Sequence, residues 1–201
     1  MDYPTIMGAA RNVATVAAFS ALIVGSNFPL AEIPNVKLLD TLVFVSAFVF
    51  GFRMGASVAI ISELAWSFVS PWGIAGAITP FLVAGELIYA AAGWAASRLW
   101  REDIRFLSKR NLFIGSVLAI SAFIWDVETN LGTALIAFWP NVTLSKIAIT
   151  ELYGVPFMLF HELSDFLLGT LFAPVVISLL ARLAKPTLRQ ATFGSPVNMD
   201  A

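Results

Sequence analysis

Residues 80–125, PFLVAGELIYAAAGWAASRLWREDIRFLSKRNLFIGSVLAISAFIW, contain the pattern that decides the fold of this chain. Two apolar runs, at about 80–98 and 112–138, are separated by a charged segment from Arg98 to Arg110. An apolar run of about 20 residues is long enough to cross a bilayer as an α-helix. The stretch therefore predicts two membrane-spanning helices joined by a short basic loop.

The same pattern continues on both sides of this stretch. Further apolar segments lie at about 12–28, 38–52, 55–70 and 156–182, and prolines, glycines or charges separate them. We therefore expect an all-α integral membrane protein, with a bundle of six transmembrane helices in residues 1–185 and a polar C-terminal tail in residues 186–201. The bundle would form one substrate-binding unit anchored in the lipid bilayer.

The overall composition excludes most soluble classes. Hydrophobic residues make up 59% of the 201 residues and charged residues only 12%, and the mean hydropathy is +0.84. A soluble domain carries about 25% charged residues, so this chain cannot cover its surface with charge. The formal net charge of −1 gives no reason to expect a nucleic-acid partner, and the lack of cysteine excludes thiolate catalysis and disulfides.

The distribution of lysine and arginine predicts the orientation, because cytoplasmic loops of membrane proteins are enriched in these residues. With six spans, only Lys37 and Lys146 fall on one side. Ten basic residues fall on the other: Arg11, Arg53, Arg98, Arg101, Arg105, Lys109, Arg110, Arg182, Lys185 and Arg189. Because ten basic residues lie on the side of the termini and two on the other side, the sequence predicts that both termini are cytoplasmic.

Several acidic residues fall inside the predicted spans. A carboxylate near the bilayer centre costs about 3 kcal/mol on insertion scales, so it is expected to face a cavity or a partner. With the orientation above, these acids lie in the outer half of the bundle among aromatic side chains, which predicts a pocket open to the outside. The candidate substrate-binding residues are Glu63, Trp66, Glu86, Trp125, Asp126, Asn130, His161 and Asp165.

Three alternative roles for these side chains stay open. Aromatic residues gather at membrane interfaces in any case. Glu63, Glu86 and Asp126 would also suit a proton relay in a stand-alone proton- or ion-coupled carrier. His161, Ser164 and Asp165 would suit an intramembrane hydrolase.

The spacing of His161 and Asp165 resembles that of a zinc-binding helix. Residues four apart share one helix face, and both side chains are of a kind that binds zinc. No second histidine or cysteine completes such a site. We therefore expect no metal and no catalytic residue.

The first span carries a stripe of small residues. Ala10, Ala14 and Ala18 are spaced by four and therefore share one helix face, which lets another helix approach closely. The partner helix could belong to this bundle or to a second protein.

Together these features resemble the S components of energy-coupling factor (ECF) transporters, which capture a vitamin or related micronutrient in an outward-facing pocket. The alanine stripe matches the Ala-x-x-x-Ala motif of that family. IPNVK at 33–37, GFRMG at 51–55, SPWG at 70–73 and TPF at 79–81 also look like the family. The similarity extends to about Trp94, and the second half matches only in hydropathy.

The resemblance implies a transport subunit, not an enzyme, in the plasma membrane of a prokaryote and without a cofactor. Its partners would be a membrane T component, docked on Ala10, Ala14 and Ala18, and two ATPase subunits; this chain has no P-loop. Relatives that transport metal begin with Met-His, whereas this chain begins Met1-Asp2, so metal is set aside. The excess of buried acids favours a cationic aromatic ligand, with thiamine or a similar compound first, because carboxylates would repel an anion.

Overall fold

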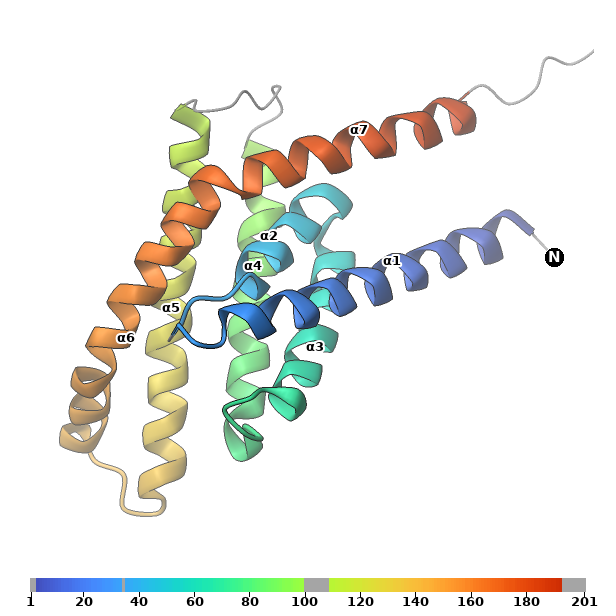
Figure 1. Ribbon diagram of the computed structural model, residues 1–201. Helices are drawn as coiled ribbons and strands as arrows, with labels where there is room; N and C mark the ends of the chain where they lie inside the picture. Colours follow the sequence, from blue (N-terminus) through green and yellow to red (C-terminus); the bar gives the residue numbers. More distant parts are fainter. Residues whose placement is uncertain (1–2, 34, 100–108, 193–201) are drawn as a thin grey trace, which may run out of the picture.

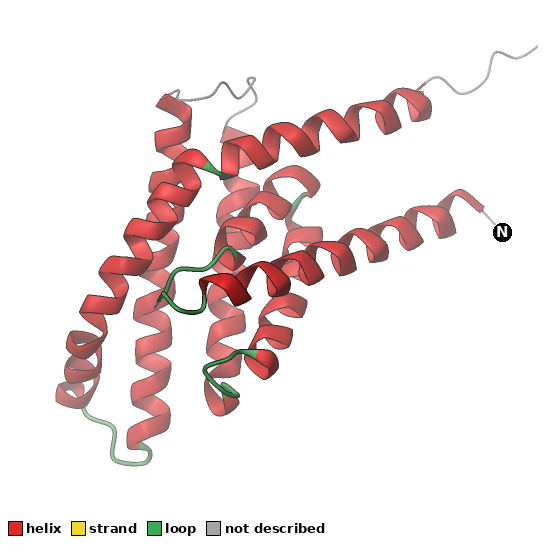
Figure 2. Ribbon diagram, in the orientation of Figure 1, coloured by secondary structure: helices red, strands yellow, loops and turns green. Residues whose placement is uncertain are grey.

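The computed structural model describes residues 3–33, 35–99 and 109–192, and these residues form helices and no strand (Figures 1 and 2). The helices in chain order are α1 (Tyr3–Asn27), α2 (Leu39–Phe50), α3 (Phe52–Val69), α4 (Thr79–Leu99), α5 (Lys109–Phe138), α6 (Leu144–Leu171) and α7 (Ala173–Thr192). Short 3-10 turns follow α1 (η1, Phe28–Leu30) and precede α4 (η2, Gly76–Ile78). The predicted all-α class is confirmed.

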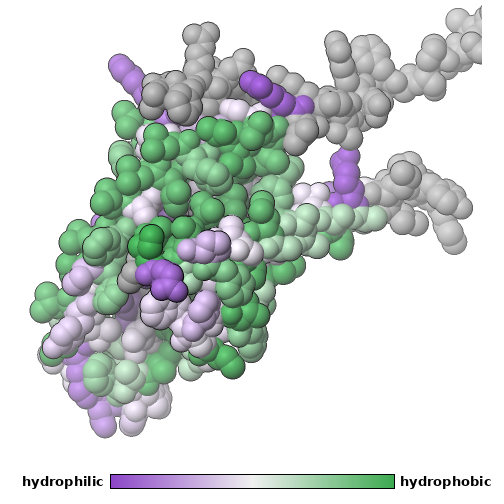
Figure 3. All heavy atoms as spheres, viewed as in Figure 1, coloured by the Kyte–Doolittle hydropathy of each residue, from purple (hydrophilic) through white to green (hydrophobic). Residues whose placement is uncertain are grey.

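Five helical segments are long and apolar enough to cross a membrane. They are Gly8–Leu30, Phe52–Val69, Gly76–Leu99, Lys109–Phe138 and Leu144–Arg182. Large hydrophobic side chains are exposed along them, as is typical of a surface that faces lipid, and Figure 3 shows such side chains over much of the face in view. The chain is therefore a multi-pass, all-helical membrane protein.

The short helix α2 lies at the centre of the bundle. Its 12 residues correspond to about 18 Å, less than the roughly 30 Å of a bilayer core. Every residue from Leu39 to Ala47 is buried, and α2 contacts α1, α3, α4, α5, α6 and α7. Because other helices surround it, α2 can carry polar groups such as Asp40 without exposing them to lipid.

Two glycines allow neighbouring helices to approach α2. Gly51 has a φ of +89° and forms the single-residue turn between α2 and α3. The predicted break at 51–55 is thus confirmed at Gly51. A Cβ on Gly93 of α4 would meet the backbone carbonyl of Phe44, so glycine is required at that crossing.

The boundaries predicted for the last span are wrong. The final transmembrane helix α6 begins at Leu144, not near Pro156, because the side chain of Thr143 caps its start by accepting from the Lys146 N–H. Pro156 lies inside α6, and packing against neighbouring helices lets transmembrane helices tolerate proline. The apolar run then breaks at Phe172, after which α7 turns away from α6 (Figure 1).

The N-terminal half of α1 and most of α7 extend out of the bundle on the same side in Figure 1. Helix α7 continues through Lys185 to Thr192, and the predicted tail beyond it lies outside the described residues. The loop arginines Arg101 and Arg105 also lie outside them.

Candidate functional site

A cavity of about 170 Å³ lies beside the segment 31–38, which joins α1 to α2. Tryptophan side chains from α3, from the α3–α4 connection and from α5 contribute to its wall. The residues that line it are Asn27, Ala31, Ile33, Asn35, Val36, Lys37, Glu63, Trp66, Trp72, Leu82 and Trp125. Three indoles with one carboxylate and one ammonium are the mixture of apolar and convergent polar groups found in small-molecule pockets.

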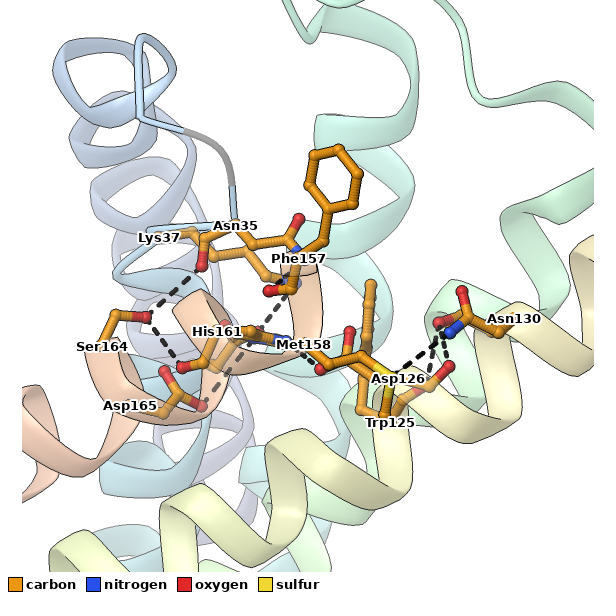
Figure 4. Close-up of polar contacts among 12 residues, drawn as sticks. Asn35, Lys37, Trp125, Asp126, Asn130, Phe157, Met158, His161, Ser164 and Asp165 are labelled. Carbon is orange, nitrogen blue, oxygen red and sulfur yellow. Dashed lines mark hydrogen bonds and ion pairs between the residues drawn. The ribbon is translucent and has the colours of Figure 1, made fainter. Parts of the chain in front are cut away.

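Hydrogen bonds of Asn35 and Leu38 hold residues 35–38 of this segment to α6 and to the end of α1. Asn35, in the left-handed region with a φ of 56°, donates from its side chain to the Phe157 carbonyl of α6 at 3.2 Å. The Ser164 hydroxyl reaches the Asn35 carbonyl at 3.4 Å, and the Leu38 N–H donates to Asn27 Oδ1 at 3.1 Å. Figure 4 shows Asn35 and Lys37 above α6 in this arrangement.

Lys37 brings a positive charge into the site. Its Nζ lies 3.0 Å from Asp40 Oδ1, 3.5 Å from Glu86 Oε1 and 4.0 Å from the centroid of the Trp125 ring. Burial lowers the pKa of this ammonium, but the carboxylates of Asp40, Glu86 and Glu63 outweigh burial and raise it above its usual value. Lys37 is therefore a cation at any physiological pH.

His161 connects three helices through its ring. Its Nδ1 lies 3.0 Å from Asp126 Oδ2 on α5, and its Nε2 lies 3.1 Å from Asp40 Oδ2 on α2. Two carboxylates at the two ring nitrogens match the doubly protonated imidazolium, which donates from both. The edge of the ring also meets Trp125, with centroids 5.2 Å apart.

Tyr89 of α4 and Asp165 of α6 complete the polar network. The Tyr89 hydroxyl donates to Asp165 Oδ2 at 2.7 Å. The same oxygen lies 4.0 Å from His161 Nε2. All three side chains are fully buried.

One group in this network has the spacing of metal ligands. Asp40, His161 and Asp165 each offer a ligand atom within 4.8 Å of the others. Lys37 already pairs with Asp40, however, and Tyr89 already donates to Asp165. One oxygen of each carboxylate therefore faces a protein donor, Tyr89 for Asp165 and His161 for Asp40, and Asp40 Oδ1 pairs with Lys37, whereas Asp165 Oδ1 has no hydrogen-bond partner among the described residues.

The structure brings seven of the eight predicted site residues into one region. Glu63, Trp66 and Trp125 line the cavity, and Lys37 links it to the network formed by Glu86, Asp126, His161 and Asp165.

Asn130 lies elsewhere. Its amide donates to Glu151 Oε2 at 3.2 Å and reaches Met158 Sδ at 3.6 Å, so it joins α5 to α6 outside the cavity lining. Its position one turn above Asp126 puts both on one face of α5, but that face contacts more than one neighbour.

Sequence reasoning missed three members of the site: Lys37, Asp40 and Tyr89. By sequence, Lys37 is only a basic residue of an outer loop, and Tyr89 is only an aromatic residue. Asp40 stands in the first turn of α2, a position where acids are common because they complement the helix dipole. The available signal was the spacing of Lys37 and Asp40, three residues apart, at the entrance to an otherwise apolar helix.

The hydroxyl of Ser164 does not face a base. It donates to the backbone carbonyls of Asn35 and His161, while both ring nitrogens of His161 face carboxylates. A hydrolase needs its nucleophile within hydrogen-bond reach of the base, so this geometry does not favour the hydrolase hypothesis.

Ala10, Ala14 and Ala18 are exposed, as are Ala17 and Ala21 on the neighbouring row. The stripe therefore packs against no helix among the described residues, and the bundle does not use it.

The chain matches no protein-family model, no curated protein and no solved structure.

Proposed function

We propose that this chain is the substrate-binding S component of an ECF-type importer in the plasma membrane of a prokaryote. In this proposal α2 is a short sixth transmembrane helix surrounded by the five long transmembrane segments, and both termini are cytoplasmic. The chain captures a small molecule from outside, while the partner subunits hydrolyse ATP.

The observation that carries the proposal is the cavity beside the segment 31–38. Three tryptophans and Glu63 line it, and a buried ionic network adjoins it. Buried ionisable groups inside a membrane bundle are expensive and are retained where they bind a substrate or an ion. The distribution of basic residues favours an outward-facing position for this cavity.

The chemistry of the site favours a cationic aromatic ligand such as thiamine. Five buried carboxyl groups, Asp40, Glu63, Glu86, Asp126 and Asp165, face two basic groups, Lys37 and His161. An anion would find more acidic than basic groups around it in a low-dielectric site. A flat cation would stack on the indole faces and neutralise carboxylates.

The exposed alanine stripe of α1 supports a partner in the membrane. Small residues on an exposed helix face permit close approach of another helix, and this stripe has no partner in the described bundle. A T component is the partner that the proposal assigns to it.

Two measurements test the proposal together. The tagged chain, expressed with ATPase and T subunits from the same genome, should retain them through purification in detergent. Mass spectrometry of the small molecules that co-purify should identify the ligand. A chain that recovers neither subunit and whose ligand uptake continues without them would contradict the proposal.

A stand-alone proton-coupled carrier is the second candidate, favoured by the hydrogen-bonded connection from Tyr89 through Asp165 to His161 and Asp126. Such a carrier would keep transporting after ATP depletion and would stop when an uncoupler collapses the proton gradient. The S component would show the opposite dependence on ATP.

A further inference from the structure

Lys37 is the one positive charge that the segment 31–38 contributes to the cavity, and three groups surround it. Asp40 lies 3.0 Å from its Nζ, Glu86 lies 3.5 Å away, and the Trp125 ring centroid lies 4.0 Å away. Two carboxylates and an indole face are the groups by which proteins bind organic cations. The ammonium therefore sits in a cation subsite built by α2, α4 and α5.

We infer that the Lys37 ammonium occupies the cation subsite when no ligand is bound, as a stand-in for the ligand. A cationic ligand then binds by displacing this ammonium from Asp40, Glu86 and Trp125. This inference rests on the proposed function, because it specifies how the cavity takes its substrate.

Glu86 supports this inference. It is fully buried, and neither of its carboxylate oxygens accepts a hydrogen bond from the described residues. The Lys37 ammonium at 3.5 Å neutralises it only through an ion pair. A buried carboxyl group without a hydrogen-bond partner is costly, so a ligand that places an N–H donor within hydrogen-bond distance of Glu86 satisfies it better than Lys37 does.

The attachment of Lys37 makes displacement feasible. Residues 35–38 lie outside the helices, between η1 and α2. The side chain has a flexible four-carbon stem, so its ammonium can leave the subsite without movement of a membrane-spanning helix. The hydrogen bonds of Asn35 and Leu38 hold the backbone of the segment in the meantime.

The competing role for Lys37 is that of a fixed anchor for a ligand carboxylate. Its contacts with Asp40 and Glu86 argue against this role, since the ammonium already faces two negative charges. The two roles predict opposite effects of removing the charge: a stand-in competes with a cationic ligand, and an anchor holds an anionic one.

The test uses the full chain in detergent with Lys37→Ala, and Lys146→Ala as the matched control. Lys146 also lies over an aromatic ring, 5.1 Å from the Phe138 centroid, but its Nζ donates to the Asn141 carbonyl and pairs with no carboxylate in the described chain. Propylammonium, a copy of the end of the lysine side chain, is the first probe. Propylammonium should raise the melting temperature of the Lys37→Ala protein and leave the melting temperatures of the wild type and Lys146→Ala unchanged. Propanol, the uncharged control, should change none of the three melting temperatures.

Thiamine is the second probe and biotin the third. Quenching of tryptophan fluorescence measures the binding of each. Thiamine should bind Lys37→Ala about tenfold more tightly than wild type, the order expected when a competing charge-assisted contact is removed. Weaker thiamine binding by the variant, or loss of biotin binding present in the wild type, would assign Lys37 the anchor role and overturn the inference. Failure of Lys37→Ala to bind either cation would overturn it as well.

If Lys37→Ala does not fold alone, it is expressed and purified with propylammonium throughout. Recovery of folded protein that depends on propylammonium supports the inference, and no recovery under these conditions contradicts it. Assembly with the T component and the ATPases is measured separately on the same variants. A variant that assembles normally but binds thiamine less well refutes the stand-in role while leaving the proposed function intact.

Discussion

His161 Nδ1 lies 3.0 Å from Asp126 Oδ2, so a buried histidine of α6 and a buried aspartate of α5 share a hydrogen bond inside the bundle. The other ring nitrogen faces Asp40 of α2 at 3.1 Å. One ring thus ties the central helix to the α5–α6 pair, and its charge balances the carboxylates around it.

Replacing His161 with leucine should strongly destabilise the protein. The change removes the donors that face Asp126 Oδ2 and Asp40 Oδ2, while Asp40 keeps its ion pair with Lys37. Breaking a buried pair from one side costs about 3–5 kcal/mol. Thermal unfolding in detergent measures the loss. The double variant with Asp126→Leu should lose less than the sum of the two single variants, because it removes both partners at once. Additive losses would show that the two side chains do not interact.

The Tyr89 hydroxyl provides a smaller and cleaner test of the same network. Tyr89→Phe keeps the ring and removes only the donor to Asp165 Oδ2 at 2.7 Å. A hydrogen bond to a charged group is worth about 1.5–3 kcal/mol, and we expect a loss of that size in the free energy of unfolding. Tyr153→Phe is the control, since Tyr153 is 77% exposed. Equal melting temperatures for the two variants would contradict this role of Tyr89.

The all-helical membrane fold could be predicted because long apolar runs separated by charge have few other stable forms. The convergence of Glu63, Trp125, Asp126, His161 and Asp165 could be predicted too, because buried acids in a bilayer must find cavities or partners. Local hydropathy does not predict those features of the fold that depend on tertiary contacts or on a single side chain. It does not indicate that α6 begins next to Thr143, where a side-chain cap decides the boundary.

The same limit applies to the placement of residues around the site. The helix face shared by Asp126 and Asn130 does not say which neighbour each side chain meets, and Asn130 turns to Glu151. Lys37 belongs to a loop, and loop placement follows from contacts between residues distant in the sequence, such as the hydrogen bond from Asn35 to α6. Asp40 does not stand out in the sequence, because an acid at a helix start has a local cause that needs no partner.

Glu63 should determine affinity for a cation. It lines the cavity, and its Oε1 accepts a hydrogen bond from Ser67 at 3.2 Å. Glu63→Gln preserves the size and the acceptor while removing the charge, so thiamine affinity should fall by about 1–3 kcal/mol, the value of a charge-assisted contact. Isothermal titration of the purified chain measures the change. Glu151→Gln, at the Asn130 contact outside the cavity lining, should leave the affinity unchanged.

Gly85 should control the position of Trp125. A Cβ at Gly85 of α4 would meet the Trp125 ring, so Gly85→Ala forces the indole out of its present position beside Lys37 in the cavity wall. We expect a changed tryptophan emission spectrum and weaker ligand binding. Gly25→Ala is the matched control in α1, because a Cβ there meets no atom within 4 Å. Unchanged emission and affinity in Gly85→Ala would show that the Trp125 position does not matter for binding.

The alanine stripe of α1 should act in assembly and not in ligand binding. Ala14 is exposed and lies outside the cavity lining, so Ala14→Trp should fold normally and bind thiamine like the wild type. A bulky ring in the middle of the stripe prevents close approach of a second helix, and we expect recovery of the T component and the ATPases in a pull-down to be lost. Asn12→Trp places the same ring on the opposite, also exposed face of α1 and should leave recovery intact. Equal recovery by both variants would rule out the stripe as the docking face. Equal loss would mean that any bulk at this end of α1 interferes, so only a difference between the two faces supports helix-to-helix docking through Ala10, Ala14 and Ala18.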